Sequence, residues 1–447
     1  MRTKLIRLGA LLIAILMLAA VVGCSGGSNN NQVSINAGGG EADGDTPDQI
    51  RIQEQIKTLG EDITVLVAGS VESLGCQMEG QRYEQLTGGK KVTYVSSNGY
   101  SEMQQKLASM HMTDEAPDIY SFTNQDYPSI LYKDLLMPLD DVLDLNSETF
   151  KKEKIYIDGL RWDGKCYLIP NVGSDRDLWV NKQIFIDAGI PESEWPDAQF
   201  KAGTWTWDAF LDLVKRTSDA DKNIYGFASG PNLPYIFAAT AGADFVKLTE
   251  NGLMANTKSE EITRAMNFMK SVITNPTYYP IDNTESAEEF FKRGQVAMLY
   301  NGIWISENEI LGEQLQNGDI YLTSFPRDPK LDKHYRMGDI YGIAIPAGAK
   351  HVNGAVAYIL SGYASDYYKD QIQDINQEAK HWTDETRDYI YDDLLEREAV
   401  LCISLGIKEI QRMTWDVITP KALTESNWET IANELDPKMQ YELDSLG

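Results

Sequence analysis

The chain has 447 residues, of which 43% are hydrophobic and 10% aromatic, so it is long enough to fold around more than one core. Its 67 acidic residues outnumber 40 basic ones and give a formal net charge of −27. That negative field repels polyphosphates and excludes nucleic acid as a partner.

The N-terminus has the pattern of a secretory signal. Arg2, Lys4 and Arg7 precede an apolar run over residues 8–22. The run is shorter than the about 20 residues that a membrane-spanning helix needs, and a basic start before a short apolar segment is typical of a signal peptide. We therefore predict a signal peptide over residues 1–23.

The residues that follow indicate a lipid anchor. Val21-Val22-Gly23-Cys24 is similar to a bacterial lipobox, in which the cysteine is acylated and becomes the mature N-terminus. Residues 25–48 are almost all small or polar and cannot bury enough apolar surface to offset the entropy of ordering. We predict a flexible tether over residues 24–61 that holds the protein on the extracytoplasmic face of the cell membrane.

The remaining cysteines do not form a recognisable metal motif. Cys76, Cys166 and Cys402 lie far apart in the sequence and have no close histidine. This spacing does not fit a zinc site, and we expect neither a metal nor a cofactor. One disulfide between two of these cysteines is possible outside the cytoplasm, but buried free thiols are the more common state.

Strands and helices alternate where the folded region begins. Residues 63–67 form a short β-branched run that predicts a buried strand, and a helix then extends to Leu86. Residues 92–95 predict a second strand, the apolar spacing over 100–112 predicts a helix, and residues 117–120 predict the start of a third strand. Such alternation implies a mostly parallel sheet with ligands at the carboxyl ends of its strands.

Several short segments, in a shared order over roughly residues 60–365, resemble one protein family. The most specific is Phe290-Phe291-Lys292-Arg293-Gly294-Gln295-Val296-Ala297-Met298, followed by Asn301-Gly302-Ile303-Trp304. Thr204-Trp205-Thr206-Trp207-Asp208 and Gly342-Ile343-Ala344-Ile345-Pro346 match in the same order. The chain resembles the bacterial extracellular solute-binding proteins of family 1, the sugar-binding lipoproteins of ABC transporters, of which maltose-binding protein is the best-known example.

The resemblance implies an α/β fold of the two-lobe, periplasmic-binding-protein-like type II class, with discontinuous lobes and a hinge. It implies crossings between the lobes near residues 171–177 and 337–342. The expected parts are an N-terminal lobe (62–173 plus 342–368), a C-terminal lobe (174–341) and C-terminal helices (369–447) that pack mainly on the C-terminal lobe.

The resemblance also implies a ligand between the lobes. A sugar needs flat aromatic rings against its C–H faces, and carboxylate, amide and guanidinium groups for its hydroxyls. Trp304 has the position of the family's stacking tryptophan, and strand alternation would place it opposite Ile303 and Ile305. The expected ligand contacts lie in loops after the strands, in both crossings and in the second lobe: Glu72, Asn98, Tyr100, Phe122, Asn124, Asp126, Ser174, Asp175, Arg176, Asn232, Tyr235, Trp304, Asp339 and Tyr341.

Structural roles compete with these assignments. Asp126 is equally suited to cap a helix that follows Pro128. Asp175 and Arg176 form the sort of neighbouring pair that is usually solvated and contributes at most about 1 kcal/mol. Trp415 is expected to pack between helices more than to reach a cleft, and Trp304 would otherwise be a core residue.

These patterns predict a binding protein and not an enzyme. It would capture a mono- or oligosaccharide by lobe closure and pass it, as a monomer, to the permease subunits of an ABC importer. The alternatives are a polyamine ligand, a role as partner of a membrane sensor, and a secreted glycosidase, which needs two carboxylates about 5 to 10 Å apart. The sequence contains no HExxH, nucleophile-elbow or Walker motif that would indicate catalysis.

Overall fold

The computed structural model describes residues 47–71, 74–123, 126–173, 176–249, 252–280, 286–364, 380–394, 396–424 and 427–446. All of them lie in one compact unit, Thr46–Gly447. The predicted signal peptide and Cys24 fall outside the described residues.

The first sheet contains six of the described strands, in the order β12-β11-β3-β1-β2, with β4 paired to β11. β1 runs parallel to β2 and β3, as the alternation of strands and helices predicted, and β11 runs antiparallel to β3 and β4. The strands of this sheet are β1 (Ile63–Ala68), β2 (Val92–Ser97), β3 (Ile119–Phe122), β4 (Ile169–Gly173), β11 (Arg336–Ala344) and β12 (Ala399–Leu401).

The second sheet contains four described strands in the order β10-β5-β9-β6, and β7 and β8 form a separate antiparallel pair. β6 runs parallel to β9, and β5 runs antiparallel to β9 and β10. These strands are β5 (Arg176–Asn181), β6 (Tyr225–Ser229), β7 (Val246–Thr249), β8 (Gly252–Ala255), β9 (Val296–Gly302) and β10 (Ile320–Thr323).

The chain passes from the first sheet to the second near the predicted residues 171–177, whereas its return lies between β10 and β11, before the predicted residues 337–342, because β11 pairs within the first sheet. β4 belongs to the first sheet and β5 to the second, and only residues 174–175 separate them. After β10 the chain returns through β11, which pairs with β12 at Arg336 and with β3 at Gly342. The pairing of β12 with β11 adds the C-terminal segment to the first sheet, which the sequence did not indicate.

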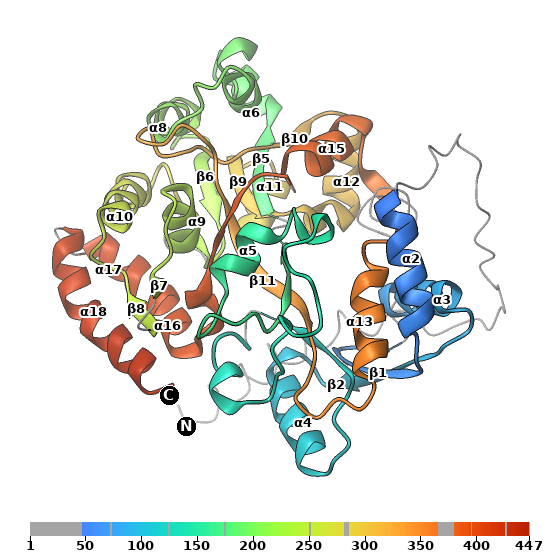
Figure 1. The fold of residues 1–447 in the computed structure, drawn as a ribbon. Coiled ribbons are helices and arrows are strands. Elements are labelled where there is room, and N and C mark those ends of the chain that lie inside the picture. The colour runs from blue at the N-terminus through green and yellow to red at the C-terminus, as the bar shows by residue number, and fades with distance from the viewer. Residues whose placement is uncertain are drawn as a thin grey trace, which may run out of the picture. The chain divides into compact units, whose positions relative to one another are not determined.

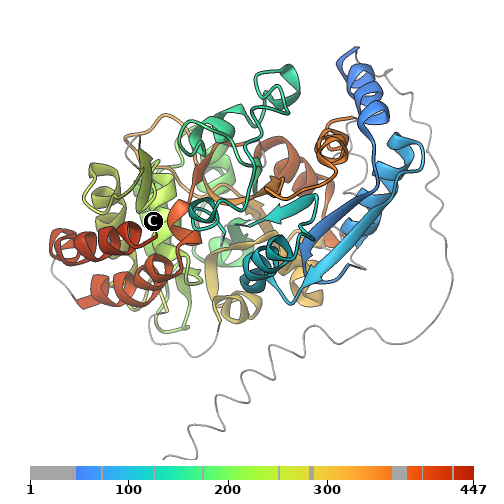
Figure 2. The same ribbon diagram turned by 60° about the horizontal axis from the view of Figure 1, so that its bottom comes forward.

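Helices cover both sheets (Figure 1). The C-terminal helices α16 to α18 lie beside α10 and β8, as both ribbon views show (Figures 1 and 2). The helices are α2 (Pro47–Leu59), α3 (Leu74–Thr87), α4 (Tyr100–Met112), α5 (Lys154–Gly159), α6 (Lys182–Asp187), α7 (Pro196–Lys201), α8 (Trp207–Thr217), α9 (Leu233–Thr240), α10 (Glu260–Ile273), α11 (Ala287–Lys292), α12 (Glu309–Gln316), α13 (Val352–Ser361), α15 (Asp384–Tyr389), α16 (Lys408–Met413), α17 (Thr419–Thr424) and α18 (Trp428–Asp444).

Alternation along β1 sends side chains to two different cores. Val65 packs in a cluster with Ile56 of α2 and Tyr83 of α3, whereas Leu66 packs in a cluster with Met103 and Leu107 of α4. The spacing of four between the last two residues is the stripe that predicted α4. The cluster around Leu66 continues to residues of the second sheet, so apolar packing is continuous from one sheet to the other.

The predicted tether is corrected at its C-terminal end. Residues 47–59 form α2, whose Ile52 and Ile56 are buried, and this helix packs against α13. The two isoleucines lie four residues apart on one helical face, and their burial against α13 stabilises the helix. The stretch predicted to be flexible therefore ends before Pro47.

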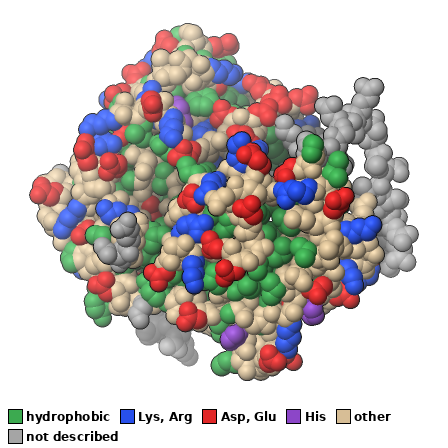
Figure 3. All heavy atoms as spheres, in the orientation of Figure 1, with side chains coloured by type: hydrophobic (Ala, Val, Ile, Leu, Met, Phe, Trp, Pro, Cys, Tyr) green, Lys and Arg blue, Asp and Glu red, His purple; other side chains and the backbone are tan. Residues whose placement is uncertain are grey.

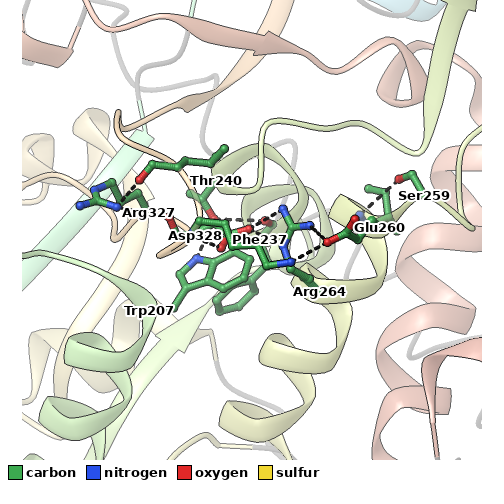
Figure 4. Close-up of polar contacts among 11 residues, drawn as sticks. Trp207, Phe237, Thr240, Ser259, Glu260, Arg264, Arg327 and Asp328 are labelled. Carbon is green, nitrogen blue, oxygen red and sulfur yellow. Dashed lines mark hydrogen bonds and ion pairs between the residues drawn. The ribbon is translucent and has the colours of Figure 1, made fainter.

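A polar network fixes the helices of the second sheet to one another (Figure 4). Asp328, which is buried, accepts hydrogen bonds from Arg264 of α10 at 2.8 Å, and its backbone N–H donates to the carbonyl of Thr240 at the end of α9. Trp207 of α8 donates to the Thr240 hydroxyl at 3.1 Å. The burial of Trp207 confirms that it packs in the core.

The described cysteines form no disulfide, and charged side chains of both signs lie on the surface. Cys76, Cys166 and Cys402 are free thiols, so the alternative of a disulfide is not realised. The face drawn in Figure 3 carries acidic and basic side chains interspersed, with no continuous basic area.

Candidate functional site

Three predicted residues from distant parts of the chain meet at the crossings. Arg176 is the first residue of β5, Asp339 lies in β11, and Trp304 follows β9. The Arg176 Nη1 atom lies 2.6 Å from the Asp339 Oδ2 atom. The Arg176 guanidinium carbon also lies 4.8 Å from the centre of the Trp304 ring. Three of the residues that the sequence proposed as ligand contacts are therefore in contact with one another.

The arginine and the aspartate form a largely buried ion pair. The exposed fraction of the side chain is 22% for Arg176 and 7% for Asp339. In such surroundings a charge is stable only when an opposite charge and hydrogen bonds compensate it. Trp304 adds a cation–π contact on one face of the guanidinium. The cluster combines an aromatic ring, a guanidinium and a carboxylate, the groups that recognise hydroxyl-rich ligands.

A second ion pair lies directly behind the first. Asp177 is buried and accepts hydrogen bonds from Arg397 at 2.8 Å, from Tyr389 at 2.6 Å and from the backbone N–H of Phe325 at 2.6 Å. Arg397 also pairs with Asp393. These contacts fix the start of β5 to the C-terminal segment and so hold the backbone at Arg176 in place.

The conformation around Trp304 differs from the expected strand. Residues Ile303–Glu307 form a 3-10 turn, in which Ile303 and Ile305 are buried and Trp304 is half-buried. The turn, and not strand alternation, separates the tryptophan from the isoleucines. A side chain at Gly302 would occupy the space of the Trp304 ring. The glycine therefore lets the indole lie back over the main chain.

A second aromatic residue joins the site at the carboxyl end of β6. Trp415 donates from its indole Nε1 to the Asn232 side-chain oxygen at 3.2 Å. It lines a cavity of about 390 Å³ together with Pro231 and Tyr279. Because Ser229 of β6 pairs with Tyr300 of β9, this cavity and Trp304 lie at the same edge of the second sheet. Sequence reasoning assigned Trp415 to helix packing, since nothing in the local pattern indicates its contact with Asn232.

The structure corrects the expected contacts in the loop after β3. Asp126 is 1% exposed and accepts hydrogen bonds from the Tyr120 hydroxyl at 2.7 Å and from the Thr123 backbone N–H at 2.9 Å. Burial raises the pKa of Asp126, although these hydrogen bonds act in the opposite direction. Phe122 is 1% exposed and packs edge-on against Tyr120 and Tyr127. Asp126 offers almost no surface to a ligand and does not cap a helix, whereas Phe122, although nearly buried, lines a cavity of about 500 Å³ together with Tyr341.

Tyr235 is placed away from the cluster, and Tyr341 lines a cavity whose lining does not include Arg176, Asp339 or Trp304. Tyr235 is 0% exposed and packs against Phe245 in the core, because α9 is buried on all sides; the expected ligand contact is corrected. Tyr341 is exposed but lines a separate cavity of about 500 Å³ with Tyr156 and Tyr363. Asn98 is exposed just after β2.

Five other predicted residues are not tested by the structure. Glu72, Asn124, Ser174 and Asp175 lie outside the described residues. Tyr100 is the first residue of α4, and its side chain lies outside the described part.

Within the described ranges, no group of three or more His, Cys, Asp or Glu side chains is arranged to hold a metal ion. The same part of the chain contains no helix that is both long and apolar enough to cross a membrane.

Comparison with known families and structures gives one consistent result. A family model described as bacterial extracellular solute-binding protein matches residues 80–391. Comparison with curated proteins finds no match.

Solved structures share the fold. The sugar-binding protein MalE from Xanthomonas citri superposes with a TM-score of 0.67 at 14% identity, covering 86% of this chain and 98% of that one. An extracellular solute-binding protein from Staphylococcus aureus in complex with maltose gives a TM-score of 0.61 at 17% identity, over 86% and 96% of the two chains. An ABC substrate-binding protein from Listeria monocytogenes in complex with cycloalternan gives 0.58 at 18% identity, over 87% and 98%.

Proposed function

The chain belongs to the bacterial extracellular solute-binding proteins, which act outside the cytoplasm, and from this premise we propose that it captures a carbohydrate between its two lobes. The first lobe is built on the first sheet and the second lobe on the second sheet. Lobe closure around the ligand would be stabilised only by contacts that the ligand makes in the closed state. We propose that Trp304, Arg176, Asp339, Asn232 and Trp415 supply those contacts.

The observation that carries this proposal is the combination of two half-buried tryptophans with polar side chains at one edge of the second sheet. Trp304 contacts Arg176, and Trp415 contacts Asn232. Indole rings suit the C–H faces of pyranoses, and guanidinium and amide groups suit their hydroxyls. Similar structures in complex with maltose and cycloalternan support a carbohydrate as the ligand.

The structure favours a carbohydrate over a polyamine. A polyamine needs carboxylates that are free to meet ammonium groups. Asp126 accepts its hydrogen bonds inside its own loop, and Asp339 pairs with Arg176. Both of these carboxylates are therefore already engaged.

We further propose the cellular arrangement that the sequence predicts. Acylated Cys24 would hold a monomer at the outer face of the membrane, next to the permease subunits of an ABC importer. The ligand would leave the protein without chemical change.

A thermal-shift screen tests the proposal. A ligand that binds only the native state must raise the melting temperature, and a concentration of 100 times Kd stabilises it by about 2.7 kcal/mol. We expect at least one mono- or oligosaccharide to raise the melting temperature, and spermidine and putrescine to leave it unchanged. A screen in which polyamines stabilise the protein and no sugar does would contradict the proposal. Chromatography of the sugar after incubation checks that it is returned intact.

A further inference from the structure

The positive charge of Arg176 in the candidate site is already paired with the negative charge of Asp339. Arg176 and Asp339 are 163 residues apart in sequence, yet their side chains meet at 2.6 Å within the crossing. With exposed fractions of 22% and 7%, neither group is fully hydrated. Because the pair contributes no net charge, a ligand in contact with it meets a guanidinium and a carboxylate of equal and opposite charge.

In the described part of the chain, the neighbouring charges have partners of their own. Asp177 pairs with Arg397, and Arg397 also pairs with Asp393. Arg336, at the start of β11, donates from its Nε atom to the carbonyl of Arg397 and lines the separate cavity that contains Tyr341. Among the described residues, Arg176 and Asp339 are therefore the charged side chains next to Trp304.

We propose that Asp339 determines the charge of the ligand: by compensating Arg176 within the site, it restricts the site to uncharged sugars. This proposal rests on the carbohydrate-binding function proposed above. A sugar acid would bring a carboxylate close to Asp339, and an amino sugar would bring an ammonium group close to Arg176. Either ligand would lose its hydration without gaining an unopposed partner.

The two members of the pair can be removed separately, with opposite consequences. Asp339→Asn keeps the shape of the side chain and leaves Arg176 uncompensated, so a ligand carboxylate can take the place of the lost one. Arg176→Gln leaves Asp339 uncompensated, so a ligand ammonium group can take the place of the lost guanidinium. The double variant, Asp339→Asn with Arg176→Gln, again has no net charge at this pair. It should therefore gain affinity for neither the uronate nor the amino sugar.

The test uses matched sugars that differ only in charge: glucose, galactose and mannose, their uronates, and their 2-amino derivatives. Affinities are measured by calorimetry with the full folded domain of wild type and variants. We expect the wild type to bind its best neutral sugar at least tenfold more tightly than the matching uronate or amino sugar. Asp339→Asn should bind the uronate at least tenfold more tightly than wild type does, and Arg176→Gln should do the same for the amino sugar.

Asp328→Asn is the matched control. Asp328 is as buried as Asp339 and also pairs with an arginine, Arg264, but it lies in the helix network of the second sheet (Figure 4). The control should keep the wild-type charge preference. If one variant does not fold, the other still tests the proposal, because each predicts a gain for a different ligand.

The outcomes separate the two proposals. A wild type that binds a uronate as tightly as its neutral sugar overturns the role of Asp339, and so does a folded Asp339→Asn that gains nothing for uronates. In both cases the carbohydrate-binding function would stand. A wild type that binds none of the sugars in this set or in the wider screen would overturn both proposals together.

Discussion

An aromatic ring and a carboxylate come together both after β3 and at the crossing near β5. The partners of these side chains are local in the first place and come from another sheet in the second. After β3, Phe122 and Asp126 are both buried and contact residues of the same loop and strand. At the crossing, Trp304 is half-buried and Asp339 meets Arg176 of the other sheet.

The difference lies in how near the partners are in sequence. Asp126 finds its donors in Thr123 and Tyr120, three and six residues away, so its loop closes on itself. The partner of Asp339 is 163 residues away, and the pair forms only when both sheets are in place. A carboxylate with local donors contributes to loop structure, whereas one whose partner comes from another sheet remains at the junction where a ligand can meet it.

The largest expected effect is on stability and comes from removing the buried carboxylate of Asp126. Asp126→Ala should lower the free energy of unfolding by about 2–4 kcal/mol, because it leaves the Tyr120 hydroxyl and the Thr123 N–H buried without an acceptor. Urea denaturation measures this loss. Sugar affinity should stay within about twofold of wild type, and Asp141→Ala, at an exposed site, should change neither quantity. Weakened binding with unchanged stability would show that Asp126 contacts the ligand.

The next effect concerns the crossing. Trp304→Ala should weaken binding of the sugar found in the screen by about 1–3 kcal/mol, as for a buried aromatic contact, with a smaller effect on stability. Calorimetric titration measures the change. Trp162→Ala, a half-buried tryptophan that packs against Tyr132, is the control and should bind as wild type. Equal affinity of Trp304→Ala and wild type would make Trp304 a core residue.

The smallest expected effect is a pH dependence of stability that comes from a third carboxylate, that of Asp244. Asp244 accepts hydrogen bonds from the backbone N–H and the hydroxyl of Ser404, and burial raises its pKa to about 6. A raised pKa in the folded state means that this group stabilises the fold below its unfolded pKa of about 4 and that the stabilisation is lost as pH rises through 6. Between pH 5 and pH 7 we expect a loss of about 1 kcal/mol from this group.

Asp244→Asn isolates that contribution, because the amide does not titrate. The difference in unfolding free energy between wild type and Asp244→Asn should change by this amount between the two pH values. Parallel pH profiles would show that Asp244 keeps an ordinary pKa.

The sequence predicted the local elements well because their signals are local. The β-branched run at 63–67 and the apolar stripe over 100–112 correspond to β1 and α4. The crossing near residues 171–177 was predicted through family resemblance and is present as β4 and β5. The α2 helix was missed, since its two buried isoleucines stabilise it through packing against other elements, chiefly α13, which lies about 300 residues later in the chain.

The contacts among the candidate site residues could be predicted only in part, for the same reason. Residue type identified Arg176, Trp304 and Asp339, but it could not separate them from Phe122, Asp126 and Tyr235, which carry similar groups. The two sets differ in the partners of their side chains, and for Arg176, Trp304 and Asp339 those partners come from elements distant in sequence. The contact of Trp415 with Asn232 is of this kind, as the two residues are 183 positions apart.

Gly302 determines where the side chain of Trp304 can lie. Gly302 leaves the volume into which the indole of Trp304 folds back, and even a methyl group there would collide with the ring. An alanine at this position would force the indole of Trp304 to move from where it lies. Ligand preference can therefore change through position 302 with every ligand-contacting side chain left as it is, which gives the Asn-Gly-x-Trp sequence a steric meaning in addition to a chemical one.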